Sequence, residues 1–131
     1  MKSLLRDIMP SQANHARISK QSCYYLHNEE TVLIVKFYEK EINGESCLIV
    51  RLIKTGSLYR QQGIAKKFLK DLYNSIDKTL ILSDVVSDIM YETMNKLFNV
   101  EEIERLDPTP LNAAWHGFDS NYGDFKIVGS K

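Results

Sequence analysis

The segment LYRQQGIAKKFLKDLYNSI, residues 58–76, joins a glycine-containing turn to an amphipathic helix. From about residue 62, apolar side chains recur every three to four positions and lysines lie opposite them, which predicts a helix with one buried face. The apolar stripe comprises Ile64, Ala65, Phe68, Leu69, Leu72, Tyr73 and Ile76. Because the residues before the turn are strand-like, we expect this helix to connect two strands.

Three strand-like segments precede the turn. Residues 22–27 and 31–39 are rich in aromatic and β-branched side chains, and residues 46–54 follow the dipeptide Asn43-Gly44. Both residues of that dipeptide tolerate the positive φ angles of a type I′ hairpin turn. The three segments are therefore predicted to form an antiparallel meander. Within residues 46–54, side chains are predicted to alternate between the two faces of the sheet. One face would carry Leu48, Val50 and Leu52, and the other Cys47, Ile49, Arg51 and Ile53.

The pattern after the helix completes a βαβ unit. Residues 79–85 predict a short buried strand, parallel to 46–54 through a right-handed crossover. Helical spacing resumes over residues 87–98, with Ser87 as N-cap and an apolar stripe of Ile89, Met90, Met94 and Leu97. Residues 113–119 and 124–129 predict two more short strands. We therefore expect one α/β (α+β) domain over residues 1–131, with a mixed, mostly antiparallel sheet flanked by helices.

Composition excludes several classes of protein. Seventeen basic residues balance seventeen acidic ones, so no overall field favours nucleic acid or an anionic membrane as a partner. The longest apolar run, residues 32–35, is far too short to span a bilayer, and MKSLLRDIMP lacks an uninterrupted signal-peptide core. The expected location is cytoplasmic.

Cysteine and histidine patterns suggest neither a metal site nor a disulfide framework. Cys23 and Cys47 both fall in strand-like segments, where a thiol behaves as a small apolar side chain. The histidines, His15, His27 and His116, are scattered without ligand spacing. We expect reduced, buried cysteines and no metal.

The Arg60-Gln61-Gln62-Gly63 turn is a candidate phosphate site. The first N–H groups of a helix lack partners within it, and the macrodipole adds about half a positive charge there. Gly63 lets backbone approach an anion closely, and Arg60, with Lys66 or Lys67, adds charged donors. A purely structural turn is the alternative interpretation.

The stretch RQQGIA, residues 60–65, resembles the Gln/Arg-x-x-Gly-x-Gly/Ala signature of the Gcn5-related N-acetyltransferase superfamily, and the order of elements over residues 22–98 is similar too. The resemblance implies a sheet with one splayed parallel strand pair and acetyl-CoA as co-substrate. It places the pyrophosphate on the turn and the acetyl thioester near Leu52 and Ile53. The implied residues of the turn are Arg60, Gln61, Gln62, Gly63, Ile64, Ala65 and Lys66.

That resemblance also implies acetyl transfer to an amine, on a small molecule or a protein lysine. Glu39 is the first candidate base, with Arg51 as a natural ion-pair partner, while Asp84 and His116 are further candidates. Aligning Leu97-Phe98 with the family's Leu-Tyr pair puts phenylalanine where the family has its acid. Tyr91 is the remaining candidate for that role, seven residues earlier.

Two alternatives to the enzyme stay open. Phe98 favours a protein that keeps the fold and binds or inhibits without chemistry. A small α+β interaction domain with an accidental resemblance is the other. Neither the acceptor nor the oligomeric state is specified by the sequence, and a homodimer is among the alternatives.

Overall fold

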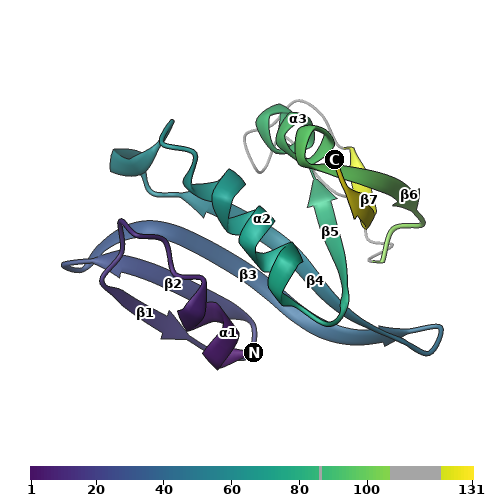
Figure 1. The fold of residues 1–131 in the computed structure, drawn as a ribbon, viewed down its shortest axis with the longest axis horizontal. Helices are drawn as coiled ribbons and strands as arrows, with labels where there is room; N and C mark the ends of the chain where they lie inside the picture. The colour runs from purple at the N-terminus through teal and green to yellow at the C-terminus, as the bar shows by residue number, and fades with distance from the viewer. Residues whose placement is uncertain (86, 107–121) are drawn as a thin grey trace.

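The computed structural model describes residues 1–85, 87–106 and 122–131 and contains one seven-stranded sheet of order β1-β2-β3-β4-β5-β7-β6 (Figure 1). The described elements are α1 (Lys2–Asp7), β1 (His15–Ile18), β2 (Ser22–His27), β3 (Glu30–Ile42), β4 (Glu45–Thr55), the 3₁₀ turn η1 (Ser57–Tyr59), α2 (Ile64–Ser75), β5 (Thr79–Val85), α3 (Asp88–Leu97), β6 (Phe98–Ile103) and β7 (Gly123–Ser130). Only β4 and β5 pair in parallel; every other described pair is antiparallel. The predicted mixed, mostly antiparallel α/β architecture is confirmed.

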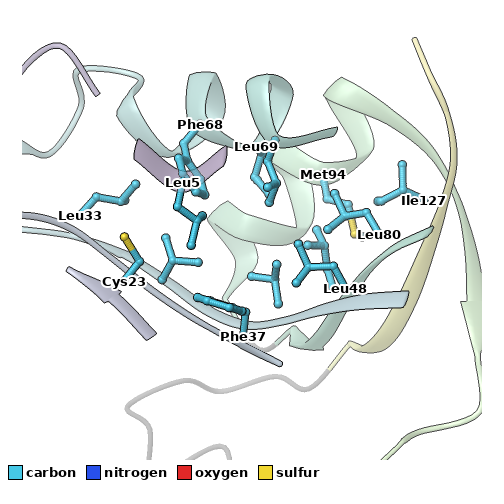
Figure 2. Close-up of a cluster of buried hydrophobic side chains, with 14 of the residues drawn as sticks. Leu5, Cys23, Leu33, Phe37, Leu48, Phe68, Leu69, Leu80, Met94 and Ile127 are labelled. Atoms are coloured by element: carbon cyan, nitrogen blue, oxygen red, sulfur yellow. The ribbon is translucent and has the colours of Figure 1, made fainter. Parts of the chain in front are cut away.

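The described helices all pack on one face of the sheet. Leu5 of α1, Phe68 of α2 and Met94 of α3 belong to one buried cluster with strand residues such as Leu33 and Leu48. Figure 2 shows Phe68 and Leu69 pointing from α2, and Met94 from α3, toward the strands. Among the described residues, no helix has the length and apolar character needed to cross a membrane. We call the helix-covered side the helix face.

Local signals in the sequence correctly predicted several element ends. Asn43 and Gly44 adopt φ angles of 52° and 79°, as the type I′ turn between β3 and β4 requires. Ser87 caps α3, because its side chain accepts a hydrogen bond from the Met90 N–H at 3.3 Å. The meander and the βαβ crossover are likewise confirmed.

A β-bulge in β4 corrects the predicted alternation of that strand. Lys36 pairs with Leu52 and Phe37 pairs with Val50, so Arg51 is an extra residue without a partner position on β3. Side chains beyond the bulge change sides. Ile53 therefore packs against the helix-face cluster, whereas Leu52 is 39% exposed on the opposite face.

Three further features differ from the sequence-based predictions. The helix expected through residue 98 ends at Leu97, and Phe98 starts β6, a strand that was not predicted. Ile89, assigned to the buried stripe of α3, is 77% exposed because it faces away from the core in the first turn. α1 and β1 were also missed. The strand predicted at 113–119 lies outside the described residues, while the strand expected at 124–129 is β7.

Gly56 has no room for a side chain, because a Cβ placed there would lie 1.8 Å from the Thr31 carbonyl oxygen. The Gly56 N–H donates to Val32 O at 2.9 Å, so the contact is between backbones and no side chain can yield. We expect Gly56→Ala to lower the free energy of unfolding by about 3 kcal/mol, the upper range for overpacking.

Urea denaturation would measure that loss, with Gly44→Ala as the control. Gly44 has open space around it and a positive φ, so alanine there should cost only about 1 kcal/mol. Equal losses for the two variants would contradict the close contact.

Candidate functional site

The parallel strands β4 and β5 pair over only part of their length. Their register runs from Cys47–Thr79 to Val50–Leu82, although β4 continues to Thr55 and β5 to Val85. Figure 1 shows the two strands diverging beyond that point. The facing backbone edges beyond the last pair therefore have no neighbouring strand among the described residues, and an extended ligand with amide groups would find donors and acceptors there.

A small cleft, partly open to solvent, lies where the strands separate. Its lining is mostly apolar with a few polar groups, as is typical of small-molecule sites. The residues lining it are Val50, Arg51, Leu52 and Ile53 from β4, Leu82, Ser83, Asp84 and Val85 from β5, and Ser87 and Met90 at the start of α3.

Asp84 is the acidic side chain of this cleft. Its carboxylate is 16% exposed and faces two guanidinium groups, Arg105 Nη2 at 3.4 Å and Arg51 Nη2 at 3.8 Å. Arg51 is half exposed, and each arginine approaches a different oxygen of Asp84. The backbone of Asp84 has a φ of 55°, which aspartate tolerates better than most residues. A charge pair thus bridges β4 and β5 where their pairing has stopped.

A fully buried carboxylate, Asp124, holds the bulge that aims Asp84. Ser83 and Asp84 together oppose Asp124 in the pairing of β5 with β7. Asp124 accepts hydrogen bonds from the Asp84 N–H at 2.8 Å, the Leu106 N–H at 2.9 Å and the Ser83 hydroxyl at 3.2 Å. These bonds supply the partners that regular strand pairing would otherwise provide.

The turn before α2 has the conformation of an open cradle. Gly63 is left-handed, with φ 72° and ψ 17°, and Gln61 also has a positive φ of 64°. A Cβ at Gly63 would meet nothing within 4 Å, and no side chain caps the helix. The backbone N–H groups of residues 64–66 have no acceptor among the described residues. These groups can therefore receive an anion.

The remaining predicted cofactor residues lie in two places. Leu52 and Ile53 line the cleft. Arg60, Gln61, Gln62 and Lys66 are exposed around the turn and are not among the lining residues, whereas Ile64 is buried in the core. Since α2 runs antiparallel to β5, its first turn and the carboxyl end of β5 lie at the same end of the sheet (Figure 1).

Of the predicted catalytic residues, only Asp84 lines the cleft. Glu39 accepts a hydrogen bond from Lys78 Nζ at 2.8 Å, beside the amino-terminal end of β5, and this bond raises the pKa of Lys78. The partner predicted for Glu39, Arg51, instead faces Asp84. Tyr91 stacks on Tyr122 at 4.0 Å between ring centroids and is not among the lining residues. His116 lies outside the described residues.

Phe98 occupies the core and not the cleft. It is 1% exposed, and its ring lies 5.2 Å from that of Tyr73 on α2. Its backbone is extended, so it no longer continues the face of α3 on which Tyr91 lies.

Neither cysteine is placed for chemistry. Cys23 and Cys47 are free and buried, and burial raises the pKa of the Cys23 thiol to about 11. A thiol that keeps its proton is a poor nucleophile. Within the described part of the chain, no three His, Cys, Asp or Glu side chains lie close enough together to hold a metal ion.

Sequence reasoning missed Asp124 and Arg105. Asp124 was assigned only to the start of a strand, although an acidic residue at an otherwise apolar strand position is a signal for a buried carboxylate with fixed partners. Arg105 lies in a polar stretch before Pro108 and carried no comparable signal.

The chain was compared with protein families, curated proteins and solved structures. No protein-family model and no curated protein sequence matches the chain. The solved structure of Arabidopsis thaliana Naa50 in complex with the bisubstrate analogue CoA-Ac-MVNAL matches 86% of this chain and 72% of its own, with 12% identity and a TM-score of 0.45. A match at this level assigns neither activity nor substrate.

The class of protein defined by the fold therefore follows from the sheet itself. The seven described strands, with one parallel pair among them that is splayed at its carboxyl end and crossed over by α2, have the arrangement of a Gcn5-related N-acetyltransferase-like fold. This is the mixed, mostly antiparallel sheet with one splayed parallel pair that the resemblance implied.

Replacing Asp124 by asparagine should destabilise the protein. The amide NH₂ would face a backbone N–H that now donates to a carboxylate oxygen, leaving buried donors unsatisfied. We expect the free energy of unfolding to fall by about 2–3 kcal/mol. Chemical denaturation would measure it, and Asp77→Asn, an exposed site, should change it by less than about 0.5 kcal/mol. Matching values for both variants would argue against the buried hydrogen bonds.

Proposed function

We propose that residues 1–131 form a single domain that transfers an acetyl group from acetyl-CoA to an amine. The observation that carries the proposal is the separation of β4 from β5 beyond Val50 and Leu82, which leaves a mostly apolar cleft between two unpaired strand edges. The open cradle at the first turn of α2 lies at the same end of the sheet. A ligand with an extended amide-containing arm and a diphosphate suits both features.

The residues present offer the chemical groups that coenzyme A would need. The free N–H groups at the start of α2 and the Arg60 side chain would hold the pyrophosphate. The backbone of β4 beyond Arg51 would pair with the amides of the pantetheine arm. Leu52 and Ile53 would surround the thioester, as the resemblance implies.

When bound, acetyl-CoA supplies a thioester whose carbonyl carbon accepts the amine nitrogen. A C–N bond forms, the C–S bond breaks, coenzyme A leaves as the thiolate and the amine gives up a proton. Since a thiol has a pKa of about 8.5, the thiolate can leave near neutral pH without a donor side chain. The chain must therefore provide positioning and a place for the proton.

Asp84 is the group of the cleft that would take up that proton. Asp84 lines the cleft where β4 and β5 separate, and a water-mediated path would let its carboxylate act without touching the amine. Arg51 and Arg105 fix its position from two sides. Glu39 and Tyr91 lie away from the cleft lining, so we assign them no role in the transfer.

A second function, favoured by Phe98, is that of a protein that binds coenzyme A or a partner without chemistry. Phe98 lies where the family aligns its tyrosine, and it offers no proton. Asp84 is also engaged by two arginines, which is compatible with a purely structural role. Turnover, and not coenzyme binding, distinguishes the two functions.

Calorimetry with coenzyme A would test the cradle directly. Wild-type protein should bind, and Gly63→Leu should raise the dissociation constant about tenfold or more, because a side chain would fill the space meant for the diphosphate. Gly44→Leu is the matched control, since Gly44 has a similar positive φ and open surroundings but lies in the β3–β4 hairpin. Absence of binding by the wild type, or equal effects of the two variants, would refute the cradle.

A thiol-release assay with acetyl-CoA and a panel of amines and peptides would separate enzyme from binder. Both cysteines are buried, so the native protein should contribute little thiol background. We expect Asp84→Asn to lower the turnover rate by about 100-fold while coenzyme affinity is retained. The control Asp77→Asn should keep the wild-type rate. Coenzyme binding without turnover on any amine would favour the second function.

A further inference from the structure

The open half of the sheet face opposite the helices carries basic and apolar side chains. Side chains alternate from Leu33 to Phe37, so Ile34 and Lys36 point away from the helix face. Cross-strand partners share that side. Ile34, Lys36 and these partners form what we call the basic face. It consists of Arg17, Tyr24, Ile34, Lys36, Leu52 and Lys54 on β1 to β4.

The basic face is accessible. Lys36 and Lys54 are exposed, and Leu52 between them is 39% exposed, an unusual environment for a leucine. On the same side, Cys47, Ile49 and Ile81 are buried in a separate cluster.

Charge on the basic face is unbalanced although the whole chain is neutral. None of its six residues is acidic. Arg17 is paired with Glu29, but Lys36 and Lys54 have no ion pair among the described residues. They lie diagonally across β3 and β4, about 7–8 Å apart at the backbone. An anionic group near Leu52 would be attracted by both.

Leu52 connects the basic face with the cleft. It is paired with Lys36 on the basic face and also lines the cleft. A molecule lying on the basic face would therefore reach the place where the acetyl thioester is proposed to sit. We propose that the acceptor amine is carried by an acidic polypeptide segment that lies across the basic face and presents its amine beside Leu52.

A peptide fits these features better than a small amine or a nucleic acid. The face extends over four strands, about 14 Å, and alternates cations with the half-buried Tyr24 and Ile34. A small amine would leave most of it uncovered. The affinity of a protein for nucleic acid grows with the number of phosphates that it neutralises. The basic face has only two lysines, Lys36 and Lys54, without an ion pair among the described residues, so it would neutralise few phosphates. The inference rests on the proposed function, because it names the substrate class of the same cleft.

Fluorescence anisotropy with the full chain would test the face. The probe is a short peptide of alternating Asp and Ala with a free amino terminus and a carboxy-terminal dye, compared with the same peptide containing Asn in place of Asp. Wild-type protein should bind the acidic peptide about five- to tenfold more tightly, as expected for two or three exposed ion pairs. Lys36→Glu/Lys54→Glu should abolish that preference.

The control variant Lys2→Glu/Lys70→Glu changes the net charge equally but on exposed positions of α1 and α2, and it should keep the preference. Coenzyme A affinity, measured by calorimetry, should be unchanged in both variants. Acetylation of the acidic peptide's amino terminus, detected by mass spectrometry, should be lost only in Lys36→Glu/Lys54→Glu.

Each alternative result has a defined meaning. Equal affinity for the two peptides, or tighter binding of a single-stranded oligonucleotide than of the acidic peptide at the same salt concentration, would overturn the inference. Peptide and coenzyme binding without acetylation would overturn the assignment of the face to the acceptor. Preferential peptide binding by a protein that does not bind coenzyme A would support the basic face and overturn the proposed function.

Discussion

The candidate site depends on one constraint: hydrogen bonding between β4 and β5 has to end at Val50 and Leu82 without leaving the strands free to close again. Two bulges impose this. The extra residue Arg51 changes the direction of β4, and the Ser83-Asp84 pair changes that of β5. Bulges increase local twist, so two of them at the same level separate strands that would otherwise continue side by side.

Asp124 offsets the free-energy cost of placing the second bulge within a buried sheet. A bulge removes regular partners from backbone N–H groups, and an unpaired buried N–H costs about as much as a lost hydrogen bond. The Asp124 carboxylate accepts the Asp84 N–H and also fixes the chain that follows β6 through the Leu106 N–H. The Asp124 side chain therefore bonds both to the β5 bulge that lines the cleft and to the chain that follows β6.

Much of this arrangement could be predicted from sequence because its signals are local. The Asn43-Gly44 turn, the apolar stripe of α2 and the Ser87 cap each depend on residues a few positions apart. The splayed strand pair was correctly anticipated only through the family resemblance, since periodicity does not report where pairing stops.

Features set by contacts between distant segments were not predictable in the same way. The bulge at Arg51 reversed the expected sides of Leu52 and Ile53, because a single extra residue shifts a period of two. The helical spacing of apolar residues in α3 continues through Phe98, but Phe98 pairs with Ser130 of β7 and is the first residue of β6. The Asp84–Arg105 ion pair joins residues on different elements, so no spacing in the chain indicated it.

The burial of Phe98 bears on how any chemistry would proceed. A tyrosine at this position would bring a hydroxyl into a core where Phe98 is 1% exposed beside Tyr73, and without a partner that hydroxyl would cost about 1–3 kcal/mol. Phenylalanine avoids that cost, and because this side chain lies in the core and not in the cleft, residue 98 supplies no proton there. Transfer in this cleft would then rely on a leaving group that needs no acid, which a thiolate satisfies and an alkoxide does not. A thioester, the donor proposed above, has such a leaving group.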